Sequence, residues 1–175
     1  SEGTIPAIIQ ANQAGVPVIE VNNKAGFGSD QAEVVTYVGA DDVEFGRLQG
    51  QLLSDSFGDV PLKIGYVMGI PGTSPQILRA QGFKEALADL PNYEIVAEVN
   101  DDFDSAKALA VTQDLLSRFP KGELDVIVMQ GPEGVAAADF ARQNGREEVK
   151  FVLGDYPADV RQAIMDGYVL GTINQ

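Results

Sequence analysis

Apolar runs alternate with helix-like segments along this chain, and this alternation constrains the fold more than any other feature. From Leu62 onward, a strand-like run, a turn and a helix-like segment follow one another four times. The runs are almost continuously apolar, as expected of strands covered on both faces. This order predicts an α/β fold with a doubly wound parallel sheet. We expect strands at 16–21, 34–38, 62–68, 93–99, 126–129, 150–153 and 169–173.

Helix-like segments with one apolar face fill most of the remaining sequence. Asp104 is a candidate N-cap for the fourth of them, and Ser74, followed by Pro75, is a candidate N-cap for the third. In that third helix the expected buried stripe is Ala80, Phe83, Leu87 and Leu90. The other predicted helices are 5–14, 43–56, 105–118, 134–143 and 157–165, and 22–30 is a predicted loop.

Six of the strand-like runs end in a polar or glycine-rich turn. The carboxyl ends of parallel strands lie on one edge of a sheet, and ligands of open α/β sheets bind beyond that edge. The pattern therefore predicts a pocket as well as a fold. The turns are Asn22-Asn23, Gly69–Ser74, Asn100–Phe103, Gln130–Glu133, Gly154–Tyr156 and Asn174-Gln175.

Four side chains near these turns are candidates for ligand binding. The Phe103 ring either packs onto its own loop or offers a flat face to a ligand. Arg79 forms either a surface ion pair or a fork directed at ligand hydroxyls or a carboxylate. Asp155 either shapes a turn or accepts hydrogen bonds from paired hydroxyls, and the Gln175 amide can both donate and accept. Together they resemble a site for a small polyhydroxyl ligand.

The composition excludes several classes of chemistry. The 175 residues include no His and no Cys, so imidazole or thiolate metal sites and Ser-His-Asp or Cys-His catalysis are excluded. No P-loop and no GxGxxG after a strand is present, and we expect no catalytic residue, metal or cofactor. Asp101-Asp102 suggests either carboxylate chemistry or turn formation and capping, and we favour the second.

The net charge of −14 disfavours binding to nucleic acids and to anionic membranes. No apolar run is long enough to span a bilayer, and the sequence starts without the pattern of a signal peptide. The first 40 residues contain one predicted helix and two short strands, too little for a core of their own. We therefore expect a piece of a larger, two-lobed protein.

The chain resembles the sugar-binding type I periplasmic binding proteins of ABC transporters, in the group similar to ribose-binding proteins. The resemblance covers nearly the whole chain and rests on these segments: 11–19, 38–42, Gly72-Thr73-Ser74 with Arg79 and Gly82-Phe83, Asp102-Phe103-Asp104, Leu115-Leu116 with Phe119-Pro120, Asp166-Gly167 and 171–175.

This resemblance implies two α/β lobes that close on a sugar or polyol in the cleft between them. It implies that residues 1–40 are a remnant of the N-terminal lobe and 41–175 the C-terminal lobe. The implied ligand-binding positions are Asn22, Arg79, Phe103, Asp155 and Gln175. Two turns depart from the pattern of ribose-type members: Asn22-Asn23 replaces Asp-Arg, and Gly131-Pro132 replaces Asn-Asp. We therefore expect a ligand other than ribose or galactose, such as another polyol, a modified sugar or a less polar molecule.

The resemblance also implies a membrane permease as partner and a periplasmic location, or a surface lipoprotein in a bacterium without an outer membrane. The alternatives are the effector domain of a lac-repressor-type regulator and a periplasmic sensor lobe, with an enzyme least favoured. We expect this chain by itself to bind ligand poorly and to be able to dimerise or exchange elements.

Overall fold

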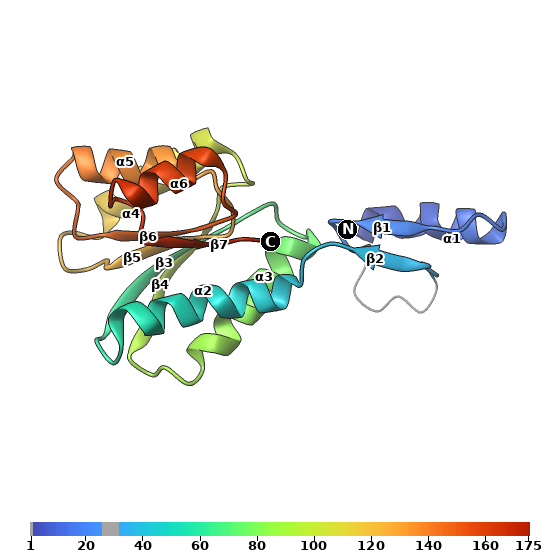
Figure 1. Ribbon diagram of the computed structural model, residues 1–175, viewed down its shortest axis with the longest axis horizontal. Coiled ribbons are helices and arrows are strands. Elements are labelled where there is room, and N and C mark those ends of the chain that lie inside the picture. Colours follow the sequence, from blue (N-terminus) through green and yellow to red (C-terminus); the bar gives the residue numbers. More distant parts are fainter. Residues whose placement is uncertain (1, 26–31) are drawn as a thin grey trace.

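The computed structural model describes residues 2–25 and 32–175 and contains a smaller and a larger part (Figure 1). In the smaller part, strands β1 (Ile19–Val21) and β2 (Thr36–Val38) pair in parallel, with Glu20 opposite Tyr37. The Asn12 side chain, at hydrogen-bond distances of 2.9 and 3.0 Å, ties the helix to the backbone of Glu33. The predicted loop 22–30 lies mostly outside the described residues. The elements here are η1 (Glu2–Thr4), α1 (Ile5–Gln13), β1 (Ile19–Val21) and β2 (Thr36–Val38).

The larger part is built on a five-stranded parallel sheet with the order β4-β3-β5-β6-β7. The chain moves outward from β3 to β4 and then returns to β5 on the other side of β3. The direction of winding therefore reverses between β3 and β5, which is where open α/β sheets leave a crevice at their carboxyl edge. The strands are β3 (Leu62–Met68), β4 (Tyr93–Asn100), β5 (Val126–Met129), β6 (Lys150–Gly154) and β7 (Gly171–Ile173).

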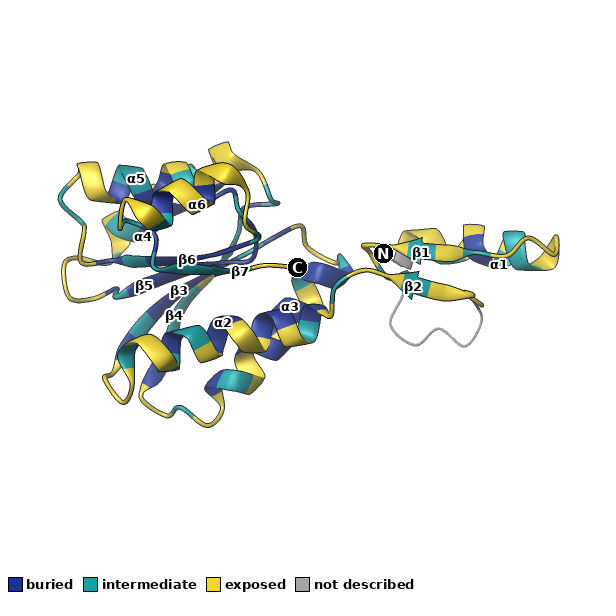
Figure 2. Cartoon of the chain, viewed as in Figure 1, coloured by how far each residue is buried: buried dark blue, intermediate teal, exposed yellow. Residues whose placement is uncertain are grey.

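Helices cover both faces of this sheet, which confirms the doubly wound prediction (Figure 1). One hydrophobic core includes Leu115, Ala138 and Val160, and the other includes Leu53 and Phe83. The buried strands lie between these two layers, whereas the smaller part is mainly exposed (Figure 2). The helices are α2 (Asp42–Phe57) and α3 (Ser74–Leu87) on one face, and α4 (Ser105–Arg118), α5 (Val135–Gln143) and α6 (Ala158–Met165) on the other.

Two glycines let α2 and α3 cross with their backbones in contact. A Cβ built at Gly46 would overlap the carbonyl oxygen of Arg79, and one built at Gly82 would overlap the carbonyl oxygen of Val43. Any side chain at either position would push the helices apart. The crossing therefore holds the backbone of Arg79 against α2.

The predicted helix starts are mostly correct. Asp41 caps α2 by accepting hydrogen bonds from two backbone amides, and Asp104 caps α4 by accepting one from Lys107 N. The prediction for Ser74 is wrong by one residue, because Thr73 occupies the N-cap position of α3. Ser74 Oγ instead accepts a hydrogen bond from the backbone amide of Lys24 at 2.8 Å, which links the two parts of the molecule.

Candidate functional site

A cavity of about 490 Å³ lies at the carboxyl edge of the larger sheet, next to the β3–β5 crevice. Its volume is within the usual range for small-molecule sites. The five residues singled out from the sequence all line it, although their ligand-binding role stays a prediction. The lining comprises Asn22, Pro75, Arg79, Phe103, Ser105, Gly131, Pro132, Glu133, Asp155, Pro157, Asp159 and Gln175.

Phe103 forms an aromatic wall of this cavity. Its backbone lies in the left-handed region, with φ 56°, directly after Asp102 with φ 57°. The ring lies against Gly69, where a built Cβ would overlap it. The ring is only partly buried and also lines the cavity. The ring therefore packs against the turn after β3 rather than onto its own loop, and its contact with a ligand stays a prediction.

Arg79 is buried at 3% exposure, so the surface ion pair considered from the sequence is not what the structure shows. Its Nε donates to Asp42 Oδ1 at 2.9 Å, and its Nη1 donates to the Gln130 carbonyl at 2.5 Å. The guanidinium also lies over the Phe45 ring, 4.0 Å from its centroid. These contacts hold the arginine in place without a ligand, while its remaining surface contributes to the cavity.

Gln130 links three parts of the floor of the site. Its Oε1 accepts from Gly69 N, and its Nε2 donates to Tyr66 Oη and to the Gln76 carbonyl. The amide is completely buried. It therefore fixes the turn after β3 and the start of α3 to the end of β5. The sequence placed Gln130 at a strand tip without giving it this role.

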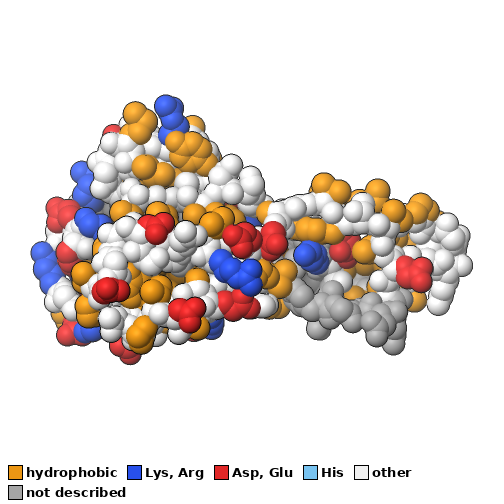
Figure 3. Space-filling view, turned by 60° about the horizontal axis from the view of Figure 1, so that its bottom comes forward, with side chains coloured by type: hydrophobic (Ala, Val, Ile, Leu, Met, Phe, Trp, Pro, Cys, Tyr) orange, Lys and Arg blue, Asp and Glu red, His pale blue; other side chains and the backbone are white. Residues whose placement is uncertain are grey.

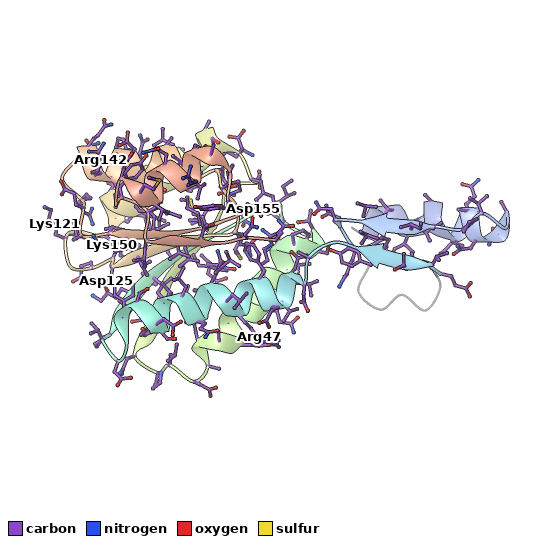
Figure 4. The ribbon with its side chains drawn as sticks, in the orientation of Figure 1. Arg47, Lys121, Asp125, Arg142, Lys150 and Asp155 are labelled. Carbon is purple, nitrogen blue, oxygen red and sulfur yellow. The ribbon has the colours of Figure 1, made fainter. Side chains whose placement is uncertain are left out.

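The last two strand tips meet through their side chains. Gln175 Nε2 donates to Asp155 Oδ1 at 2.8 Å, and Thr172 Oγ1 donates to the Asp155 carbonyl at 2.5 Å. Asp155 is half-buried and left-handed, with φ 58°, and it lies at the edge that faces the smaller part (Figure 4). The Asp155 carbonyl thus ties the turn to β7, and its carboxylate oxygen Oδ2 accepts no hydrogen bond from the described residues.

Asn22 approaches the cavity from the smaller part. Its backbone is left-handed, with φ 65°, and its backbone N–H donates to the Val38 carbonyl at 2.9 Å. The Tyr37 hydroxyl donates to the Asn22 carbonyl at 3.1 Å. Three of the five predicted positions therefore have left-handed backbone, a strained conformation that is concentrated at functional sites.

Glu133 is the main cavity residue that sequence reasoning missed. It is 9% exposed and lies next to the fully buried Asp101. Burial, followed by the interaction with Asp101, raises the pKa of Glu133 to about 8, and burial raises the pKa of Asp101. Asp101 Oδ1 also accepts from Phe103 N at 2.9 Å, which agrees with the expected turn role. The spacing of the two carboxyls, 32 residues apart, carries no local signal.

Among residues 2–25 and 32–175, no cluster of three or more potential ligand side chains is arranged to hold a metal ion. Within the same residues, no helix has the length and hydrophobicity that a membrane crossing requires.

A doubly wound α/β unit with an aromatic and polar cavity at its carboxyl edge is typical of open-sheet proteins that bind small molecules. The periplasmic binding protein domain matches residues 1–175, and the chain belongs to this family.

Curated relatives and solved structures agree with this assignment. The ribose import binding protein RbsB of Escherichia coli (strain K12) is 33% identical over 170 residues, which cover 97% of this chain and 55% of that protein. The binding protein of the arabinose ABC transporter from Shewanella sp. ANA-3, with bound arabinofuranose, superposes with a TM-score of 0.90 at 26% identity, covering 99% of this chain and 58% of that one. The Caulobacter myo-inositol binding protein, with bound myo-inositol, superposes with a TM-score of 0.86 at 26% identity. The match covers 95% of this chain and 56% of that one. The chain thus spans little more than half the length of these proteins.

Proposed function

We propose that this chain is part of the solute-binding component of an ABC-type importer and that it binds a sugar or polyol. The observation that carries the proposal is the cavity, where the Phe103 ring, the Arg79 guanidinium and the Asp155–Gln175 pair converge. A ring face suits the apolar face of a sugar, and the planar polar groups suit its hydroxyls. The relatives named for sugar import favour this function over a transcription regulator or an enzyme.

We further propose that residues 1–40 belong to one lobe and 41–175 to a second, ligand-binding lobe of a two-lobed protein. In support, the two sheets are separate and each is parallel. Asn22 and Gln175 reach the same cavity from the two parts. A periplasmic location and a membrane permease as partner follow from the function of the family, and cell fractionation tests the location.

The ligand-binding role is tested on the two-lobed protein by calorimetry. The probes are D-ribose, L-arabinose, D-allose, myo-inositol and xylitol, and native mass spectrometry identifies any ligand retained through purification. We expect Phe103→Ala and Asp155→Ala each to weaken binding by about 1–3 kcal/mol, the scale of a lost aromatic or buried polar partner.

Asp155→Asn is the matched control for backbone strain, because Asn tolerates the left-handed conformation. If this variant keeps the turn but loses affinity, the carboxylate itself contacts the ligand. Unchanged affinity in both alanine variants, or no binding of any probe, contradicts the proposed site.

A further inference from the structure

Two buried carboxyl groups meet in the wall of the cavity. Glu133 and Asp101 are close enough to hydrogen-bond to each other. Glu133 Oε1 and Asp101 Oδ2 are completely buried and receive no hydrogen bond from the described residues. Buried polar atoms are almost always paired. Two carboxyl oxygens can pair only if one of them carries a proton.

Gly131 provides the space that allows this contact. A Cβ built on Gly131 would overlap Glu133 Oε2, so the carboxyl folds back over the glycine. Gly131 is not among the glycines with positive φ, so space rather than backbone conformation requires the missing side chain. A larger residue here would displace the carboxyl from Asp101. Glu133 thus occupies the space that a side chain at position 131 would fill, in the wall of the cavity.

The two oxygens of Glu133 face different surroundings. Oε1 is buried and has no donor among the described residues, whereas Oε2 lies against Gly131, and both Gly131 and Glu133 line the cavity. Oε2 is therefore the oxygen that a ligand can reach. Oε1 is left for the contact with Asp101.

The charges around the pair favour retention of a proton. Asp102 after β4 and Asp155 after β6 act on it as negative charges, and Asp159 of α6 lines the same cavity. Among the described residues, neither Asp101 nor Glu133 forms an ion pair. Two cations of the neighbouring helices are paired with other carboxylates: Arg79 of α3 with Asp42 of α2, and Lys107 of α4 with Asp102.

We propose that Glu133 contacts the ligand as a neutral carboxylic acid: its Oε1 and Asp101 Oδ2 share one proton, and its Oε2 accepts a hydrogen bond from a hydroxyl of a neutral ligand. This inference rests on the proposed sugar- or polyol-binding function. Closure of a cleft over Oε2 excludes water and disfavours the ionised form further. The pocket therefore selects uncharged polyols, and their affinity falls as Glu133 ionises.

The first test detects the proton without any ligand. Infrared spectroscopy of the two-lobed protein at about pH 7 is expected to show a buried, protonated carboxyl that disappears in Glu133→Gln. Asp114→Asn is the matched control, because Asp114 is an exposed carboxylate in an ion pair with Arg118. The spectrum of this variant should keep the band. If the unmodified protein lacks this band, no proton is shared and the proposal fails.

The second test uses calorimetry with the five probes at about pH 6.5 and about pH 9.5, on either side of the pKa of about 8. We expect affinity to fall about tenfold or more at the higher pH. Glu133→Gln, which has the shape and hydrogen bonds of the neutral acid, should keep affinity within about threefold at the lower pH and lose the pH dependence. Glu133→Ala should lose about tenfold or more even there.

The outcomes separate the two proposals. If a probe binds but Glu133→Ala keeps full affinity, Glu133 has only a structural role and the inference is wrong, while the proposed function stands. The same holds if Glu133→Gln retains the pH dependence of the unmodified protein. If no probe binds the unmodified protein, the proposed function fails, and the ligand contact of Glu133 fails with it. In that case the infrared band alone shows whether Glu133 and Asp101 share a proton.

Discussion

Arg79 is anchored to Asp42 and to the Gln130 carbonyl, and its substitution would leave a carboxylate buried without its cation. Breaking a buried ion pair from one side costs about 3–5 kcal/mol. We therefore expect Arg79→Leu to lower the free energy of unfolding by about 3 kcal/mol or more, measured by urea denaturation. Arg47→Leu is the control, because Arg47 forms an exposed pair with Glu85 on the helix surface (Figure 4), and this variant should lose much less stability. Equal losses would show that the buried pair is not important for stability.

Glu133 should make stability depend on pH even without ligand. Its pKa rises from the usual 4.5 to about 8 on folding, so the folded protein keeps a proton that the unfolded chain releases between these values. Stability therefore decreases as the pH rises through this window and levels off above about pH 8. We expect Glu133→Gln to flatten this decrease and to be more stable than the unmodified protein at about pH 9, by about 1–3 kcal/mol. Thermal unfolding at about pH 5.5 and about pH 9 checks this, and parallel curves for the two proteins would contradict it.

Individual site residues were predictable where the strand tips locate them and were missed where a distant partner defines them. Phe103, Asp155 and Gln175 follow strand ends, which apolar runs mark clearly in the sequence. The partners of Arg79 and Glu133 are 37 and 32 residues away in the chain. Such pairs depend on which helix covers which strand. No local pattern encodes this.

At the level of helices and strands, the order of the elements was predictable from the sequence, but the close contact between helices α2 and α3 was not. The apolar runs gave β3 and β5 with the observed bounds, whereas the exposed strand β1 is three residues shorter than its apolar run at 16–21. The α2–α3 crossing depends on glycines, which in a sequence indicate turns as readily as close helix contacts. Their role becomes visible only when the two backbones are seen together.

The helix crossing gives a prediction with an internal control. Gly46→Ala would overlap backbone atoms of α3, and we expect a loss of about 2–3 kcal/mol because backbone cannot yield. Gly50→Ala would instead meet the Ala86 side chain, 2.5 Å from the built Cβ. The exchange Gly50→Ala with Ala86→Gly should therefore restore most of the stability, since it returns the methyl group to the same interface. Urea denaturation of Gly46→Ala and Gly50→Ala, each alone and combined with Ala86→Gly, tests this. Recovery of Gly46→Ala by Ala86→Gly would contradict the assigned contact.

At the scale of the whole molecule, the smaller part has little core of its own. Ile8 is the one buried hydrophobic residue among those described there, and neither main core includes it. Hydrophobic side chains lie along much of its surface (Figure 3). Ile19, Val21 and Val38 are 58%, 68% and 56% exposed, and alternation along β1 and β2 places all three on one face.

An apolar sheet face with unpaired strand edges promotes association between chains. We therefore expect the 175-residue chain, studied by itself, to form dimers or larger species at micromolar concentration, detected by light scattering coupled to size-exclusion chromatography. Ile19→Lys combined with Val21→Lys should shift it to monomer, because two charges on this face oppose a second copy. Val60→Lys is the matched control, since Val60 is equally exposed, at 58%, but lies in the larger part and should leave association unchanged. A monomeric unmodified chain, or equal effects of both changes, would show that another surface governs association.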